Sequence, residues 1–225
     1  MILSKIKAIY YFVEFIISVV LVVFFMWIFK NNMHKVRRIW AKTQRILGFY
    51  KVEIIGKAKD ANIIIVNHKS MLDIVVLEDV YPKNLCWIAK KEIGKLPIIG
   101  KIMTLPKMIP VDRESPRAII NLLKEVKDRL KDDRVIAIFP EGTRAKGNKL
   151  LKFQSGAKVL AEKLNLKVQP VVVVGSDILD VNNFTFKNGT IKVVYMDVVD
   201  TTKPDWYEDT RHKMQEILDQ NRNVD

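Results

Sequence analysis

The chain has 225 residues, one cysteine and a formal net charge of +13, with an isoelectric point near 9.7. This length suffices for one domain with an appendage, and Cys86 alone excludes an internal disulfide framework and a cysteine-built zinc site. The basic excess predicts an anionic partner, which can be nucleic acid, an anionic membrane surface or a phosphorylated substrate.

Residues 9–29 form an apolar run that contains one charge, Glu14. As a helix this run is about 31 Å long, close to the hydrocarbon thickness of a bilayer. Its fully uncharged part, residues 15–29, is only about 22 Å long. Three interpretations stay open at this point: a membrane span, a helix embedded in one leaflet, and a buried core helix.

Residues 33–50 predict a basic amphipathic helix, and no acid occurs between Lys30 and Tyr50. A basic helix after an apolar one is typical of a segment that binds anionic membrane lipids, although packing on the domain is an alternative. If the apolar run spans the membrane, the basic excess here, compared with Lys5 and Lys7 before the run, places everything from Lys30 onward in the cytoplasm. The expected location is therefore the cytoplasmic face of the cell inner membrane. The basic residues are His34, Lys35, Arg37, Arg38, Lys42 and Arg45.

Residues 1–50 are therefore expected to associate with the membrane, and residues 51–225 to form the catalytic domain. Apolar strands alternating with helices predict an α/β fold, a three-layer sandwich with a mostly parallel or mixed central sheet flanked by helices. Residues 90–113 are expected to be irregular. The expected strands are 51–56, 63–66, 85–89, 135–139, 168–174 and 190–199, and the expected helices are 70–80, 116–130, 153–164 and 206–221.

A histidine and an acid follow the apolar strand at 63–66. In one helix, His68 and Asp73 would point about 140° apart. If the helix begins at Ser70, His68 lies in the loop and the Asp73 carboxylate can reach one imidazole nitrogen, which leaves the other as a base. The alternative is a loop histidine beside a carboxylate that complements the helix dipole.

A second polar loop, residues 140–144, follows the strand at 135–139. Gly142 lets backbone N–H groups approach a ligand, Thr143 offers a hydroxyl, and the Arg144 guanidinium suits a phosphate. The alternative is a surface turn with ordinary charges. No cluster of histidines and acids has metal-ligand spacing, and no Walker or dinucleotide glycine pattern is present, so the sequence predicts no metal site.

Four blocks of the chain, in this order, resemble the glycerolipid acyltransferase family. The first is a histidine and an aspartate separated by four residues, and the third is a close match. The blocks span roughly residues 62–175 and follow the family order. They are Asn67 to Asp73, Pro97 to Arg113, Phe139 to Arg144, and Val168 to Val171.

The resemblance implies transfer of a fatty acyl group from acyl-CoA or acyl carrier protein to the sn-2 hydroxyl of lysophosphatidic acid, which gives phosphatidic acid. His68 would take the hydroxyl proton while Asp73 holds its tautomer and stabilises the imidazolium. The acyl thioester is a co-substrate, and no cofactor or metal is implied.

The resemblance also implies a binding site for the acceptor phosphate, in which Glu141 orients the other groups. One alternative is a family member with another lysolipid acceptor. The other is a non-catalytic basic protein that binds a membrane or nucleic acid. Because the aromatic residues gather in the apolar N-terminus, no nucleic-acid partner is expected. The residues expected around the phosphate are Glu141, Gly142, Thr143, Arg144 and Arg113.

Overall fold

The computed structural model describes residues 2–112 and 115–222, and its centre is a seven-stranded sheet. The strands are β1 (Lys51–Ile55), β2 (Ile63–Val66), β3 (Leu85–Lys90), β4 (Ile109–Val111), β5 (Val135–Ile138), β6 (Val168–Val174) and β9 (Thr190–Tyr195). Their order is β1-β9-β6-β2-β5-β3-β4, and only the β6–β9 pair is antiparallel. This confirms the predicted mixed, mostly parallel sheet.

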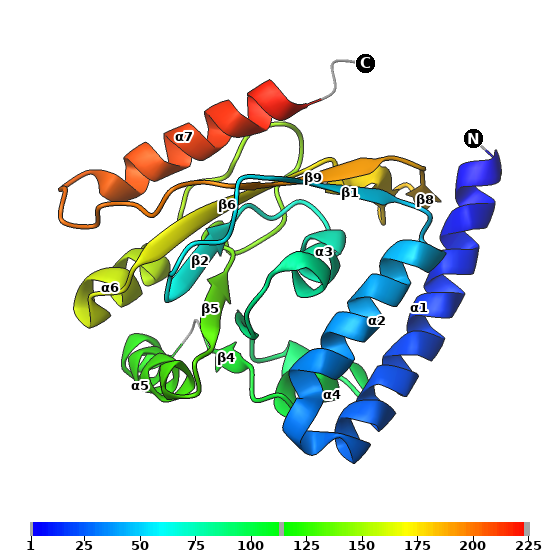
Figure 1. Cartoon of the computed structure of the whole chain (residues 1–225), viewed down its shortest axis with the longest axis horizontal. Helices are drawn as coiled ribbons and strands as arrows, with labels where there is room; N and C mark the ends of the chain where they lie inside the picture. The colour runs from blue at the N-terminus through cyan, green and yellow to red at the C-terminus, as the bar shows by residue number, and fades with distance from the viewer. Residues whose placement is uncertain (1, 113–114, 223–225) are drawn as a thin grey trace.

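Helices cover both faces of the sheet, as the sequence predicted (Figure 1). One layer holds α5, α6 and α7, and the other holds α3, α4 and the two N-terminal helices. A small hairpin of β7 (Leu179–Asp180) and β8 (Thr185–Phe186) extends from the end of β6. The helices are α1 (Ile2–Ile28), α2 (Met33–Leu47), α3 (Leu72–Val80), α4 (Ile99–Thr104), α5 (Ala118–Lys131), α6 (Ser155–Leu164) and α7 (Trp206–Asn221).

The central strands are the most apolar segments of the domain. Every residue of β2, β5 and β6 is buried, as is expected where helices cover both faces of a parallel sheet. In the register of the sheet, Ile65 of β2 pairs with Ile138 of β5 and Pro170 of β6. The carboxyl ends of these three strands therefore lie at one edge, where loops of an open α/β sheet bind ligands.

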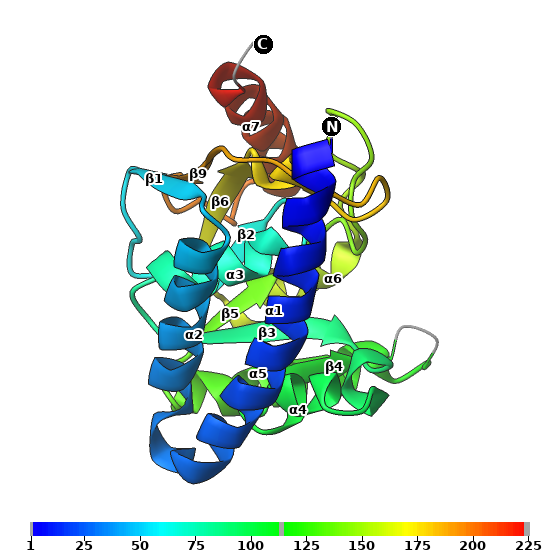
Figure 2. The same ribbon diagram turned by 90° about the vertical axis from the view of Figure 1, so that its right-hand side faces the viewer.

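The N-terminal helices α1 and α2 form an antiparallel hairpin packed along the domain (Figure 2). The α1 helix begins at Ile2, earlier than the predicted Ile9. Its inner face is buried, and Tyr11 contacts the Phe186 ring of β8 at 4.6 Å between centroids. The single acid of the apolar run, Glu14, accepts a hydrogen bond from the amide of Gln44 in α2 at 2.8 Å, which joins the two helices.

The outer face of this hairpin is strongly apolar and exposed. The α1 helix is long and apolar enough to cross a membrane by length and composition, and 28% of its most apolar window is buried inside the protein. On α2, Ile39 and Ile46 are 67% and 60% exposed. A contiguous exposed apolar surface such as this one indicates a membrane or protein contact. Other exposed apolar residues include Ile9, Val13, Ile16, Val20, Phe24 and Trp27.

The sequence interpretation of α2 needs a correction at Arg37. This residue was expected on the basic face toward lipid headgroups, but it is buried between α2 and α3. Its guanidinium lies 2.6 Å from the Glu78 carboxylate and donates to the Asn84 side chain and the Leu85 carbonyl. The α2 helix therefore packs on the domain as well as facing outward, because a buried arginine is stabilised only by such partners.

The expectation that residues 90–113 are irregular was wrong. They contain a 3-10 turn at Ile93–Lys95, helix α4 and edge strand β4. The prolines that suggested irregularity are compatible with these elements, since Pro110 lies in an edge strand, where a missing N–H is tolerated. Gly100 is required by close packing, because a Cβ there would lie 2.3 Å from the Gly94 carbonyl oxygen.

Candidate active site

His68 and Asp73 form a hydrogen-bonded pair just beyond the end of β2. The imidazole Nδ1 of His68 lies 3.0 Å from the Oδ2 of Asp73. The Asp73 side chain is fully buried, whereas 14% of the His68 side chain is exposed. Within the described part of the chain, the Nε2 of His68 has no hydrogen-bond partner. The geometry predicted from the sequence is therefore present, and the catalytic role of the pair stays a prediction.

The Asp73 carboxylate also organises the loop that carries His68. Its Oδ2 accepts hydrogen bonds from the backbone N–H groups of Lys69 at 2.7 Å and Ser70 at 2.8 Å. The helix was predicted to begin at Ser70, but it begins at Leu72, with Asp73 in the first turn. The carboxylate holds the loop amides outside the helix, and the positive end of the α3 dipole favours its charge.

Aromatic stacking fixes the plane of the His68 imidazole. The ring lies on the face of Phe139, with a centroid distance of 3.8 Å and an interplanar angle of 14°. The indole of Trp87 lies nearly parallel to Phe139 at 5.2 Å. Because the hydrogen bond to Asp73 fixes one ring nitrogen and the stack fixes the plane, the direction of Nε2 is determined.

Glu141 connects the second polar loop to the first. Its Oε1 accepts the backbone N–H of His68 at 2.7 Å, and its Oε2 accepts that of Leu151 at 2.7 Å. The Ala145 N–H donates in turn to the His68 carbonyl at 2.8 Å. Burial raises the pKa of the Glu141 carboxyl above its ordinary value, and the two N–H donors oppose that shift. Glu141 thus holds the two loops together through backbone amides, and its orienting role toward the phosphate-binding groups stays a prediction.

The residues predicted to bind the phosphate differ in how the structure places them. Gly142 has a positive φ of 73°, which favours glycine and forms the turn after β5. Thr143 and Arg144 are exposed, and among the described residues their side chains make no hydrogen bond or ion pair with the polar network around His68. Arg113 lies outside the described residues. Phosphate binding by this set stays a prediction.

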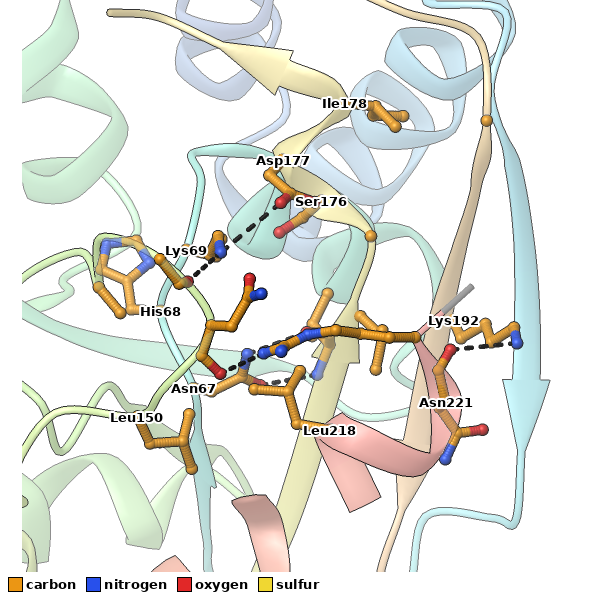
Figure 3. A pocket seen from close by; sticks show the side chains of 18 of the residues that line it. Asn67, His68, Lys69, Leu150, Ser176, Asp177, Ile178, Lys192, Leu218 and Asn221 are labelled. Atoms are coloured by element: carbon orange, nitrogen blue, oxygen red, sulfur yellow. Dashed lines mark hydrogen bonds and ion pairs between the residues drawn. The ribbon is translucent and has the colours of Figure 1, made fainter. Parts of the chain in front are cut away.

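A cavity of about 570 Å³ opens beside the His68 loop at the same edge of the sheet (Figure 3). Its wall is built from the loops after β2 and β6, the segment before β9, and the carboxyl end of α7. Asn67 supports this wall by pairing with Val173 of β6, donating to its carbonyl at 2.9 Å and accepting its N–H at 2.7 Å. His68 and Glu141 line the cavity, whereas Arg144 does not.

Comparison with known proteins agrees with this geometry. A family model described as Acyltransferase matches residues 48–174, the part of the chain that contains both polar loops. The 1-acyl-sn-glycerol-3-phosphate acyltransferase of Helicobacter pylori (strain J99) is 39% identical over 189 residues, which cover 82% of this chain and 80% of that protein. The chain belongs to the acyltransferase family.

Two further relatives of this acyltransferase have lower sequence identity. A chloroplastic 1-acyl-sn-glycerol-3-phosphate acyltransferase of Arabidopsis thaliana is 30% identical, and the match covers 83% of this chain and 54% of that protein. The crystal structure of the 1-acyl-sn-glycerophosphate acyltransferase PlsC from Thermotoga maritima has the same fold, with a TM-score of 0.78 and 22% identity. That similarity covers 100% of this chain and 99% of the other.

Sequence reasoning missed several residues at the site of this acyltransferase. The stacking partner Phe139 was treated as the end of a strand, although its place directly before the second polar loop was a usable signal. Lys69 was overlooked, yet its backbone N–H binds Asp73 and its ammonium lies 3.5 Å from Asp177. The contribution of Arg222, after α7, carried no local signal, because the fold alone brings it to the cavity.

Proposed function

We propose that this acyltransferase moves a fatty acyl group from acyl-CoA or acyl carrier protein to the sn-2 hydroxyl of lysophosphatidic acid, giving phosphatidic acid. The observation that carries the proposal is the 3.0 Å contact of His68 with buried Asp73, which leaves Nε2 available for a substrate hydroxyl. The printed names of the bacterial and plant relatives support the same reaction.

In this mechanism His68 acts as the general base. Its Nε2 takes the proton of the acceptor hydroxyl while the oxygen attacks the thioester carbonyl carbon, forming a tetrahedral intermediate. The intermediate collapses, the carbon–sulfur bond breaks, and the imidazolium returns its proton to the leaving thiolate. Asp73 stabilises the imidazolium meanwhile, and such catalysis contributes roughly 10²–10⁴ in rate. The products are an ester and a free thiol, so the atoms balance without a metal or further cofactor.

We also propose that the second polar loop binds the phosphate of the acceptor. The Arg144 guanidinium can form paired hydrogen bonds with phosphate oxygens. Gly142 and Thr143 can add backbone and hydroxyl donors, with Arg113 as a second cation. Exposure of Arg144 leaves its guanidinium accessible to a ligand. Glu141 contributes by holding this loop against the His68 loop.

The N-terminal hairpin would hold the enzyme on the cytoplasmic face of the cell inner membrane, in contact with anionic lipids. The inner face of α1 is occupied by the domain, with Tyr11 and Met26 fully buried. This supports embedding in one leaflet, because crossing the bilayer would separate α1 from its contacts with β8 and α4. An acceptor dissolved in that leaflet then reaches the site laterally.

The test is purified protein with acyl thioesters and two acceptors that differ in the phosphate, lysophosphatidic acid and monoacylglycerol. We expect free thiol and phosphatidic acid from the first acceptor, and much slower transfer to the second. Arg144→Ala should raise KM for lysophosphatidic acid more than KM for the donor. Equal use of both acceptors, or a change confined to the donor KM, would contradict the phosphate assignment, and no transfer at all would refute the proposed function.

A further inference from the structure

The wall of the cavity beside the His68 loop is strongly basic. Among the described lining residues five side chains are basic and two are acidic, which leaves an excess of three positive charges. Most other polar lining groups are amides and hydroxyls. A concave site lined by one sign of charge concentrates ligands of the opposite sign. The basic residues are Lys69, Lys149, Lys187, Lys192 and Arg222, and the acidic residues are Glu141 and Asp177.

The two acids do not offset this charge toward a ligand. The Asp177 carboxylate lies 3.5 Å from the Lys69 ammonium, so it is already paired (Figure 3). Both oxygens of Glu141 accept backbone N–H groups, from His68 and Leu151, and the residue is only 3% exposed. The Arg222 guanidinium is paired with the Asp219 carboxylate at 3.3 Å, so the lining basic groups without an acidic partner among the described residues are Lys149, Lys187 and Lys192.

Two of the basic groups, Lys192 and Arg222, are held in place by hydrogen bonds to other parts of the chain. The Lys192 ammonium of β9 donates to the Asn221 carbonyl of α7 at 3.2 Å and keeps further N–H donors for a ligand. The Arg222 guanidinium donates to the Asn148 carbonyl in the loop after the second polar motif. The buried Ser176 hydroxyl, also in the wall, has no hydrogen-bond partner among the described residues.

The size and position of the cavity identify the kind of ligand. Its volume of about 570 Å³ is that of a small-molecule site. His68 is part of its wall, and the His68 imidazole is stacked on Phe139, the residue directly after β5. A ligand in this cavity therefore lies beside the reacting atoms without filling the space they need. Acyl-CoA is divided in the same way into a bound part and a reacting part. A flexible pantetheine arm joins its reactive thioester to a nucleotide with several phosphate groups.

We propose that this basic cavity binds the phosphorylated nucleotide of an acyl-CoA donor. The inference rests on the proposed acyl transfer and assigns the donor for it. A carrier protein would dock on an outer surface and bring only one phosphodiester on its arm, which does not use a cavity of this volume and charge. A lipid headgroup with one phosphate would not engage all of the unpaired basic groups, Lys149, Lys187 and Lys192.

The experiment compares two donors that share the same acyl thioester, acyl-CoA and S-acyl-pantetheine, which lacks the nucleotide. The measured quantity is the ratio of their kcat/KM values in wild type, Lys149→Glu, Lys192→Gln and the control Lys127→Glu. Lys149 is exposed in a loop, so its charge reversal does not threaten folding. Lys127 is exposed on α5 outside the cavity. Binding of adenosine 3′,5′-bisphosphate to the full chain is measured separately by calorimetry.

We expect each cavity variant to lower the preference for acyl-CoA by roughly tenfold, as for loss of a charge-assisted phosphate contact, while the control keeps it. Adenosine 3′,5′-bisphosphate should bind wild type and compete with acyl-CoA. An unchanged ratio in both cavity variants would overturn the proposal. Cavity variants that keep the ratio and instead lose binding to phosphatidic acid vesicles would also overturn it. Transfer from acyl carrier protein but not from acyl-CoA would also overturn it and leave the acyl transfer intact. No transfer from any donor would instead refute the proposed function.

Discussion

Substitution of Asp73 by asparagine separates the charge of the carboxylate from its geometry. One oxygen, Oδ2, accepts all three described hydrogen bonds, from the imidazole of His68 and the N–H groups of Lys69 and Ser70. An amide oxygen in the same place keeps these contacts. Asp73→Asn should therefore fold with the loop intact and lose the negative charge beside the imidazole, while its NH2 group takes the place of Oδ1, which is buried without a partner among the described residues.

The structure gives the size of the expected loss. At the observed 3.0 Å, the attraction between an imidazolium and a carboxylate is roughly 5 kcal/mol for an effective dielectric constant of about 20. The neutral hydrogen bond that asparagine retains offsets about 1 kcal/mol of this. The remaining ~4 kcal/mol corresponds to a decrease in kcat of about 10³.

The assay is free thiol release at saturating donor and acceptor, combined with urea unfolding of the same preparations. Asp73→Ala is the matched variant, because it removes the acceptor as well and leaves three donors without this partner, of which the Ser70 N–H is buried and costs about 1–3 kcal/mol when unpaired. We expect Asp73→Asn to be the more stable of the two by about 1–3 kcal/mol. A kcat within tenfold of wild type for Asp73→Asn, or equal stability of the two variants, would refute this reasoning.

Three further predictions concern stability and membrane binding. Arg37→Ala should lower the free energy of unfolding by about 3–5 kcal/mol, because it leaves the buried Glu78 carboxylate without its ion-pair partner. The control Lys35→Ala, at an exposed position, should change it by less than about 0.5 kcal/mol. A loss below about 1 kcal/mol for Arg37→Ala would contradict the buried pair. The pKa of Glu141 is raised in the folded state above its ordinary value of 4.5, so the folded protein holds that proton more tightly. Urea unfolding should thus show wild type losing stability relative to Glu141→Gln as the pH rises from 4.5 through the folded-state pKa; a relative gain over that range would have the wrong sign. Ile46→Glu on the outer face of α2 should weaken binding to anionic vesicles by roughly tenfold without loss of stability. The control Val198→Glu, outside the hairpin, should leave vesicle binding unchanged. Equal effects of the two variants in a sedimentation assay would argue against the hairpin as the membrane contact.

The sheet could be predicted because its central strands are apolar on both faces. The runs at 63–66 and 168–174 need no information from distant residues, since burial between two helical layers requires apolar residues throughout. The His68–Asp73 contact was predictable for a similar reason, because both residues belong to one short loop and helix start. Local chemistry decides such features.

Features that depend on distant parts of the chain were not predictable. The partner of Arg37 is Glu78, 41 residues away, so an arginine on a basic helix gave no sign of being buried. The strand β4 is only three residues long and contains Pro110, and pairing with β3 defines it more than its own composition. The basic cavity gathers Lys69, Lys192 and Arg222, which only the folded sheet and α7 bring together.

The central claim is that the Nε2 of His68 acts as the base for a lipid hydroxyl. The most direct measurement is acyl transfer to lysophosphatidic acid by His68→Ala, compared with wild type at equal vesicle binding and equal thermal stability. The account predicts that kcat falls by roughly 10²–10⁴ while membrane binding is unchanged. Near-normal kcat in His68→Ala would contradict it.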